Sequence, residues 1–421
     1  MVDTNSWMGK IPSDWKVSKI GNAYTARNEK VSDLDYQPLS VTMKGVVPQL
    51  ATAAKSDDHN NRKLVKKGDF CINSRSDRRG SCGISPYDGS VSLINTILEP
   101  RDEMIPEYYE WLFHTSQFAD EFYKWGHGIV DDLWTTGWSE MKRILIPVPP
   151  IREQEQIADF LNRTCADIDS AIEEARSGIQ DFRDLKQAII TNAVLGGLKS
   201  VETRRESEIE WVGSIPSHWS VTRFIFANWI RGRLGWKGLK ADEYVLDGYP
   251  FLSAFNIINN KLSWDNLNYI TKERYDESPE IKLSIGDILL VKDGAGIGKC
   301  ARIDDLPLGE ATVNSSLAVI SPSEGINYKY EYYYLQSNVF QNIIARLRNG
   351  MGVPHLTQES MKAIKLPLPP LAEQMEIVDY LEEACMHMDT MIEEKTALIN
   401  DLDNYRKSFI FGVVTGKRKA V

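Results

Sequence analysis

Apolar residues recur at steps of three and four in two long stretches of the chain, near residues 151–194 and 371–414. The first stripe consists of Ile157, Leu161, Ile168, Ile172, Ile179 and Phe182, and the second of Ile377, Leu381, Met388, Ile392, Ile399 and Leu402. This spacing places the stripe on one face of a helix, with a period typical of coiled coils. Roughly 40 residues at about 1.5 Å each predict a rod of about 60 Å. Such a stripe requires a partner, and the nearest candidate is the other stretch.

Both stretches open with the same motif, Pro-Pro-x-x-Glu-Gln, at Pro149 and at Pro369. Proline is tolerated in the first turn of a helix and excluded from its interior, so each pair predicts a helix start. Glu153 then adds negative charge near the helix N-terminus, where the helix dipole favours it. Two unrelated core helices would explain the stripes but not the repeated opening. The sequence therefore indicates a duplicated unit.

The duplication extends into the segments that precede the helices. Residues 7–15 read Trp-Met-Gly-Lys-Ile-Pro-Ser-Asp-Trp, and residues 211–219 read Trp-Val-Gly-Ser-Ile-Pro-Ser-His-Trp. Each segment also contains a Gly-Asp turn, at Gly68 and at Gly286, followed by an apolar strand and a glycine-rich turn. Strand-like pieces at 90–98 and 311–320 precede aromatic helices at 108–125 and 328–347. Short strands, many turns and one helix in each segment predict two α+β domains.

The expected organisation is thus two globular domains and two long helices, related by an internal pseudo-twofold repeat. The predicted segments are residues 1–146, 147–200, 201–366 and 367–421.

Composition is ordinary for a globular protein, with 42% hydrophobic and 26% charged residues among 421. Neither an apolar run of membrane-spanning length nor a signal peptide is found. The five cysteines are widely spaced, which predicts reduced thiols, no zinc site and a cytoplasmic location. The net charge of −10 by itself argues against a nucleic-acid partner, but residues 151–200 and 371–421 together carry −7 of that charge. The two domains are near neutral and can hold local basic faces.

Catalytic motifs are missing where they would be expected. The turn at 294–299 resembles a phosphate-binding loop, but Asp293 and Cys300 stand where a P-loop requires Gly and Ser or Thr. The six histidines are scattered, and the adenine methyltransferase motif Asn/Asp-Pro-Pro-Tyr/Phe and the Gly-x-Ser-x-Gly motif are not found. The sequence therefore predicts no catalytic residues and no metal site.

Basic residues instead gather among polar and aromatic ones in both domains, which is the pattern of a nucleic-acid-binding surface. Between residues 223 and 240 there are five basic and no acidic residues, interleaved with Trp229 and Trp236. Arginine reads guanine edges, asparagine reads adenine, and lysine holds phosphate. The candidate DNA-binding residues are Arg62, Lys63, Lys66, Lys67, Asn73, Ser74, Arg75, Arg78, Arg79, Arg223, Arg231, Arg233, Lys237, Lys240, Lys292 and Lys299.

A domain followed by Pro-Pro-x-x-Glu-Gln-x-x-Ile and a long helix, repeated and ending in Val414-Thr415-Gly416-Lys417, resembles the specificity subunit of type I restriction–modification enzymes. The end of the first helix departs from this pattern, because Val194-Leu195-Gly196-Gly197 stands where the family has Val-Thr-Gly-Lys.

The resemblance implies two target-recognition domains, each reading half of a split double-stranded DNA site. It implies that the family's two conserved helices form an antiparallel coiled-coil spacer. It also implies docking of two methyltransferase subunits and of restriction/translocase subunits, which are the ATP-driven motor and nuclease. S-adenosylmethionine, ATP and Mg are then expected on those partners and not on this chain.

Two alternatives remain at the level of the sequence. A coiled-coil adaptor that binds only proteins would share the helices but would not retain specific DNA. A nuclease or methyltransferase with an unrecognised site would show activity as an isolated chain.

Overall fold

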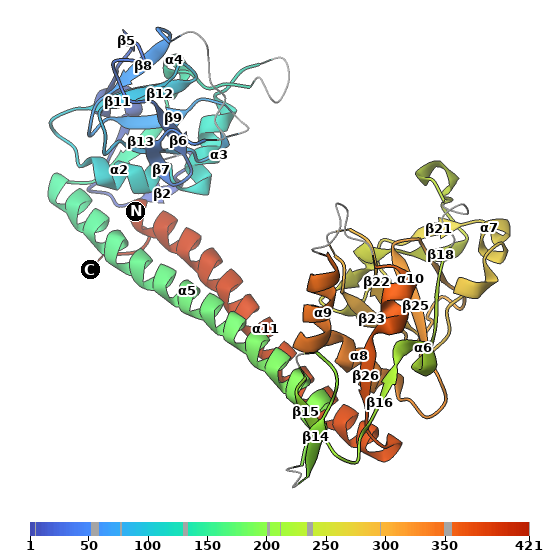
Figure 1. Cartoon of the computed structure of the whole chain (residues 1–421). Coiled ribbons are helices and arrows are strands. Elements are labelled where there is room, and N and C mark those ends of the chain that lie inside the picture. Colours follow the sequence, from blue (N-terminus) through green and yellow to red (C-terminus); the bar gives the residue numbers. More distant parts are fainter. Residues whose placement is uncertain are drawn as a thin grey trace. The chain divides into compact units, whose positions relative to one another are not determined.

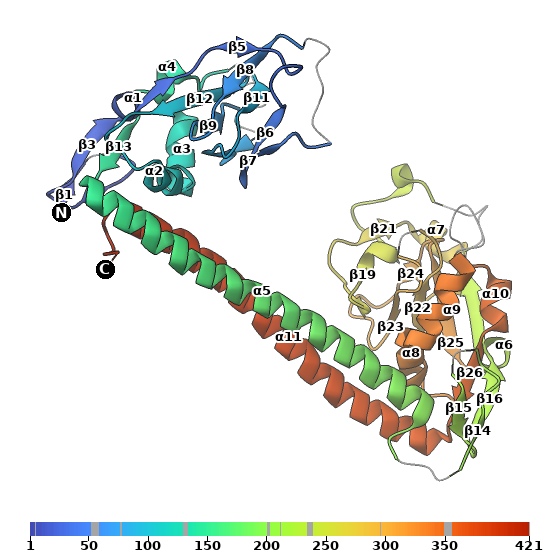
Figure 2. The same ribbon diagram turned by 60° about the vertical axis from the view of Figure 1, so that its left-hand side comes forward.

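The computed structural model describes residues 1–4, 6–51, 59–75, 78–128, 134–199, 203–210, 212–233, 239–294, 296–348 and 356–420. The chain forms two compact units: unit 1 contains Met1–Arg176 and Thr396–Val421, and unit 2 contains Ser177–Lys395. Each unit combines one globular part with a stretch of both long helices (Figure 1, Figure 2). The boundary between the two units falls within both long helices, so it does not test the four segment bounds expected from the sequence. Those bounds stay a prediction.

The globular part of unit 1 is built on an antiparallel sheet with the strand order β10-β9-β12-β4. Its strands are β4 (Tyr24–Ala26), β9 (Phe70–Asn73), β10 (Cys82–Ile84) and β12 (Asn95–Pro100). The sheet β11-β8-β5 joins β11 (Gly89–Ser92), β8 (Arg62–Val65) and β5 (Lys30–Val31). Strand pairs are formed by β1 (Val2–Asp3) with β2 (Lys10–Ile11), β3 (Lys16–Lys19) with β13 (Leu145–Val148), and β6 (Leu39–Thr42) with β7 (Gly45–Pro48). The short helices are α1 (Ile20–Ala23), α2 (Pro106–Phe113), α3 (Ser116–Lys124) and α4 (Trp138–Met141).

Unit 2 repeats this plan with the strand order β17-β25-β22-β23. These strands are β17 (Asn228–Gly232), β22 (Ile288–Val291), β23 (Cys300–Arg302) and β25 (Leu317–Pro322). The sheet β21-β18-β24 joins β21 (Asn268–Ile270), β18 (Tyr249–Leu252) and β24 (Thr312–Val313). Strand pairs are formed by β14 (Arg204–Glu206) with β15 (Ser214–Pro216), β16 (Ser220–Arg223) with β26 (Lys365–Leu368), and β19 (Ile257–Ile258) with β20 (Lys261–Leu262). The short helices are α6 (Phe224–Ala227), α7 (Lys272–Asp276), α8 (Tyr328–Gln336), α9 (Asn338–Arg348) and α10 (Gln358–Ala363), with 3₁₀ turns at Ala241–Glu243, Ala254–Asn256 and Pro279–Ile281.

The Gly-Asp turns take the same form in both units. Gly68 and Gly286 have φ of 92° and 93°, a region that only glycine adopts without strain. The aspartate that follows accepts a hydrogen bond from the backbone N–H three residues earlier, at 2.8 Å in both units. Asp69 also binds Arg27, directly after β4, at 2.7 Å, and Asp287 binds Arg231 of β17 at 2.9 Å. The motif therefore ties the turn to a neighbouring strand.

The aromatic helices predicted at 108–125 and 328–347 are each two helices, which corrects the expectation of one. Thr115 accepts a hydrogen bond from the N–H of Phe118 and starts α3, while Ser337 accepts from the N–H of Phe340 at the start of α9. A hydroxyl at the N-cap satisfies an otherwise unpaired N–H and favours a new helix start. Their aromatic side chains fill each unit's core, as in the Phe70–Phe113 contact with ring centroids 5.0 Å apart.

The predicted long helices are present as α5 (Ile151–Gly196, 46 residues) and α11 (Leu371–Val414, 44 residues), each beginning directly after a Pro-Pro pair. No helix among the described residues is long and apolar enough to cross a membrane.

The glutamine of the repeated motif fastens each helix start to its globular part. Gln154 donates to the carbonyl of Pro149 at 2.9 Å and accepts from the N–H of Ile105, the N-cap of α2, at 3.0 Å. Gln374 donates to Pro369 at 2.9 Å and accepts from the N–H of Asn327, the N-cap of α8, at 2.8 Å. A buried amide that satisfies both groups explains why the motif contains glutamine in both copies.

Within each unit, α5 and α11 lie side by side and run antiparallel (Figure 1, Figure 2). In unit 1, Phe160 meets Phe409 and Asp169 pairs with Arg406 at 3.1 Å. In unit 2, Lys186 pairs with Asp389 at 2.6 Å. The stripe residues Ile157, Leu161, Ile168, Ile172, Ile179, Ile377 and Leu381 are buried, whereas Phe182, Met388, Ile392, Ile399 and Leu402 are half-buried.

The end of each long helix packs on the globular part of the unit in which it lies. The carbonyl of Val414 accepts from the Tyr108 hydroxyl at 2.8 Å, and that of Val194 accepts from Tyr330 at 3.1 Å. The left-handed glycine that ends the helix is Gly416 in α11 (φ 67°) and Gly197 in α5 (φ 74°). The sequence that departs from the family pattern, Leu195-Gly196-Gly197, therefore still ends the helix with a left-handed glycine. That glycine lies three residues after Val194, whereas Gly416 lies two residues after Val414.

Candidate nucleic-acid interface

The loop that follows β9 contains three of the seven basic candidates of the first domain, Arg75, Arg78 and Arg79. Asn73 ends the strand, and its side chain accepts from the N–H of Arg75 at 3.0 Å. Arg79 pairs with Asp120 of α3, and its guanidinium lies 5.3 Å from the ring of Tyr123. A pocket opens here, lined by Asn73, Ser74, Arg75, Arg78 and Arg79 together with Phe118, Tyr123 and Trp134. Charged and planar groups thus meet on one surface.

A second hollow of about 490 Å³ adjoins this loop and shares Ser74 with the pocket. Its lining includes Asn28, Lys63, Thr96, His127 and Thr135. Lys63 donates from Nζ to the carbonyl of Asn95 at 2.7 Å, and its burial lowers its pKa. The hollow is rich in donors and acceptors, as a surface that contacts base edges or phosphates must be.

Arg62, Lys66 and Lys67 do not join this loop. Arg62 is buried and donates to the side chain and carbonyl of Ser90, both at 2.9 Å, so it stabilises the β8–β11 pair. Lys66 and Lys67 are exposed, but they lie in the turn before β9, whereas Ser74 follows its other end.

Two candidates of the second domain are also core residues. The Arg231 side chain is 6% exposed and pairs with Asp287, and that of Arg233 is 1% exposed, 3.9 Å from Glu277. Burial, followed by the charge of Arg274, lowers the pKa of Arg233. Neither guanidinium reaches the surface. Arg231 and Arg233, like the buried Arg62, are therefore not part of the proposed interface.

The loop after β22 is the second domain's counterpart of the loop after β9. Lys292 follows β22 as Ser74 follows β9, and Lys299 precedes β23 as Ser81 precedes β10. Lys292 lies 3.4 Å from Asp293, and Lys299 is exposed. Arg223 and Lys240 are exposed elsewhere in the unit, and Lys237 lies outside the described residues. The repeat therefore singles out one equivalent loop in each domain.

Aromatic and polar residues that the sequence analysis did not single out also line the first-domain surface. Tyr123 and Trp134 stack with centroids 5.9 Å apart, and His127 lies in the adjoining hollow. The aromatic richness of residues 118–138 was the available signal, but it is also what a buried helix shows. Among the described residues, no group of His, Cys, Asp and Glu could hold a metal ion.

Comparison with known proteins places these features in a family. The sequence pattern of the type I restriction modification DNA specificity domain matches residues 12–176 and 238–400, which together make up most of the chain. The chain belongs to this family.

Relatives within the family span almost the whole chain. The type I restriction enzyme MjaVIII specificity subunit of Methanocaldococcus jannaschii is 24% identical over 426 residues, covering 97% of this chain and 94% of the relative. The EcoKI specificity subunit of Escherichia coli is 26% identical over 209 residues, covering 49% and 44%.

Solved structures share the fold. A chain from work on complex assembly and conformational transition of the type I R-M system has a TM-score of 0.75 at 15% identity, covering 97% of this chain and 100% of that chain. The HsdS subunit from Thermoanaerobacter tengcongensis has a TM-score of 0.55 at 16% identity, covering 99% and 100%.

Proposed function

We propose that this chain is the DNA-sequence-specificity subunit of a type I restriction–modification complex. The observation that carries the proposal is the duplication: the family pattern matches both halves, and in each half an equivalent polar loop begins directly after the same strand of the same sheet, at Ser74 and at Lys292. Each globular part would then be a target-recognition domain that reads one half of a split site in double-stranded DNA. The chain itself is non-catalytic.

In this function α5 and α11 form an antiparallel coiled coil that sets the distance between the two half-sites. Its outer surface would dock two methyltransferase subunits, with restriction and translocase subunits joining them. Those partners would bring S-adenosylmethionine, ATP and Mg. The complex would act in the cytoplasm, where the five buried free cysteines remain reduced.

Exchanging residues 201–366 for those of another family member should change one half of the methylated sequence and leave the other half intact. The reason is that each domain has its own sheet, core and polar loop. Mapping methylated bases in cells that carry the chimera and the methyltransferase subunits measures the outcome. The reciprocal exchange of residues 1–146 is the matched control. A change in both halves with either chimera would contradict independent reading.

Substitution in the loop after β9 should separate reading from positioning. Arg75→Ala or Arg79→Ala should relax preference at one base position by about 1–3 kcal/mol, because a bidentate arginine–guanine contact is lost. Lys66→Ala and Lys67→Ala, at the other end of β9, should weaken binding equally on all sequences, by the phosphate contribution alone. Affinities of the assembled complex for a panel of single-base variants measure both. Equal losses from all four substitutions on every DNA would show that Arg75 and Arg79 do not read bases.

A further inference from the structure

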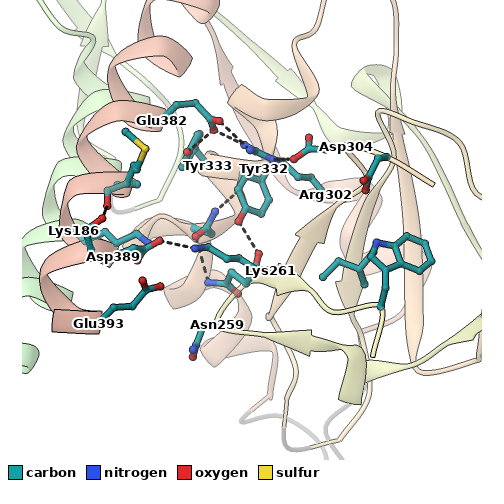
Figure 3. A pocket seen from close by; sticks show the side chains of 18 residues that line it. Lys186, Asn259, Lys261, Arg302, Asp304, Tyr332, Tyr333, Glu382, Asp389 and Glu393 are labelled. Carbon is teal, nitrogen blue, oxygen red and sulfur yellow. Dashed lines mark hydrogen bonds and ion pairs between the residues drawn. The ribbon is translucent and has the colours of Figure 1, made fainter. Parts of the chain in front are cut away.

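An ionic network joins the globular part of unit 2 to α11. Arg302, the last residue of β23, binds Glu382 of α11 through both guanidinium nitrogens, at 2.5 and 3.0 Å. The hydroxyl of Tyr333 in α8 donates to Glu382 at 2.7 Å, and Asp304 holds Arg302 from the other side at 2.7 Å (Figure 3). The two carboxylates, Glu382 and Asp304, therefore fix the orientation of the Arg302 guanidinium and neutralise its charge.

A second ionic contact lies seven residues further along α11, or about 10 Å. Asp389 pairs with Lys186 of α5 at 2.6 Å and with Lys261 at 2.9 Å. Lys261 begins β20, directly after the turn at Asn259 and Asn260, whose positive φ angles of 51° and 59° fit a tight hairpin. The hydroxyl of Tyr332 donates to the Asn260 carbonyl at 2.7 Å, so the turn is itself anchored.

The two contacts border a cavity of about 530 Å³ between the helices and the globular part of unit 2 (Figure 3). Two separated contacts across a hollow resist rotation better than one, because a single contact acts as a pivot. The Arg302 and Glu382 side chains are 18% and 34% exposed, so the pair is only partly screened by salt. Desolvation raises the pKa of Glu382, but hydrogen bonds from Arg302 and Tyr333 outweigh it and lower that pKa to about 2.

Unit 1 forms the contact equivalent to Arg302–Glu382 without ions. Ile84 ends β10 as Arg302 ends β23, and Trp111 is the sixth residue of α2 as Tyr333 is of α8. Asn162 holds the place in α5 that Glu382 holds in α11, and it accepts from the Trp111 indole at 3.0 Å. The duplicated fold therefore does not require the ionic contact at Arg302, which is particular to the second half, whereas the Lys186–Asp389 pair has its counterpart in Arg406–Asp169.

We propose that Arg302, Glu382 and Asp389 are positioning residues that hold the second recognition domain at one orientation on the helix pair and thereby restrict the complex to one gap length between half-sites. This inference rests on the proposed function, because it assumes that both domains bind one DNA molecule. The ionic contacts make this restriction dependent on salt.

The test compares complete complexes, containing wild-type chain or Arg302→Met with the methyltransferase subunits, on DNA with the cognate gap and with gaps one base pair shorter or longer. Arg302→Met should lower the ratio of cognate-gap to shifted-gap methylation by about tenfold, as expected when one partner of a partly buried ion pair is removed. Half-site sequence preference should not change. Arg302→Lys, which keeps the charge, should restore most of the ratio.

Two further arms complete the test. The triple variant R302I/Y333W/E382N installs the residues of unit 1 and keeps the ion pairs of Asp389. Its gap ratio should therefore fall less steeply than that of wild type as salt rises. Glu173→Gln removes an exposed ion pair within α5 and should leave the ratio unchanged. An unchanged ratio in both Arg302→Met and the triple variant would overturn the inference, as would an Arg302→Lys ratio as low as that of Arg302→Met. A wild-type complex that methylates no split site would instead contradict the proposed function.

Discussion

Inserting four residues into both long helices, after Arg176 in α5 and after Lys395 in α11, should lengthen the unread gap of the DNA site by one or two base pairs. Four residues add about 6 Å of helix, and B-DNA rises about 3.4 Å per base pair. Both insertions fall where the chain passes from one unit to the other, so the contacts within each unit are retained. Both half-site sequences should remain the same.

The matched control inserts two residues at the same positions. Two residues rotate the following part of a helix by about 200°, which turns the apolar stripe away from its partner. Ile172 and Ile179 are buried in the wild-type chain and lie on opposite sides of the insertion. After the insertion they can no longer both face the partner helix, and one of them would face water. The expected result is loss of methylation, measured by mapping modified sites in cells. An unchanged gap after the four-residue insertion would show that the helices do not set it, and full activity after the two-residue insertion would exclude the stripe as the pairing surface.

Replacing Glu331 with glutamine should stabilise unit 2 at pH 8 by a few kcal/mol and have little effect near pH 4. Glu331 is buried in α8 and accepts from the Asn228 amide at 2.6 Å, while its second oxygen has no partner among the described residues. Burial raises its pKa to about 8 from the ordinary 4.5, more than the Asn228 hydrogen bond lowers it.

The sign follows from proton binding. Between pH 4.5 and 8 the unfolded chain ionises Glu331 while the folded chain retains the proton, so stability is full below pH 4.5 and is lost as pH rises to about 8. At about 1.4 kcal/mol per pH unit, the loss is at most about 5 kcal/mol. Glutamine carries no charge, so Glu331→Gln removes this loss of stability at high pH. Urea midpoints at pH 5 and pH 8 measure the difference, with exposed Glu324→Gln as control. A gain that is the same at both pH values would exclude ionisation as the cause.

The helices and the duplication could be predicted because their signals are local. A proline pair fixes a helix start by its own geometry, and a stripe with helical spacing needs no knowledge of the partner. The function of Gln154 could not be predicted, because the N–H that it accepts from belongs to Ile105, 49 residues earlier. Its recurrence as Gln374 indicated only that the position was constrained.

The basic runs were harder to interpret, because counting charges does not say which face of a strand they occupy. Arg231 is buried because Asp287, 56 residues later, reaches it, and its equivalent Arg27 lies in no basic run at all. The loop after β22 shows the opposite case. Lys292 and Lys299 are only two charges in a glycine-rich stretch, and what makes them candidates is the strand β22, which places them in the loop equivalent to the one after β9. The pairing of strands, and not composition, separates structural arginines from candidate reading residues.

The hydrogen bond from Tyr108 to the Val414 carbonyl has a consequence for synthesis on the ribosome. The core of unit 1 includes Phe409, Ile410, Val413 and Val414, so its first 176 residues must wait for the last stretch of the chain before that core can close. Unit 2 is contiguous in sequence and can fold while the C-terminal residues are still being made. Contacts between distant residues slow folding, and incomplete cores expose apolar surface to aggregation. Unit 1, whose first residues are translated first, is therefore the unit whose core is completed last.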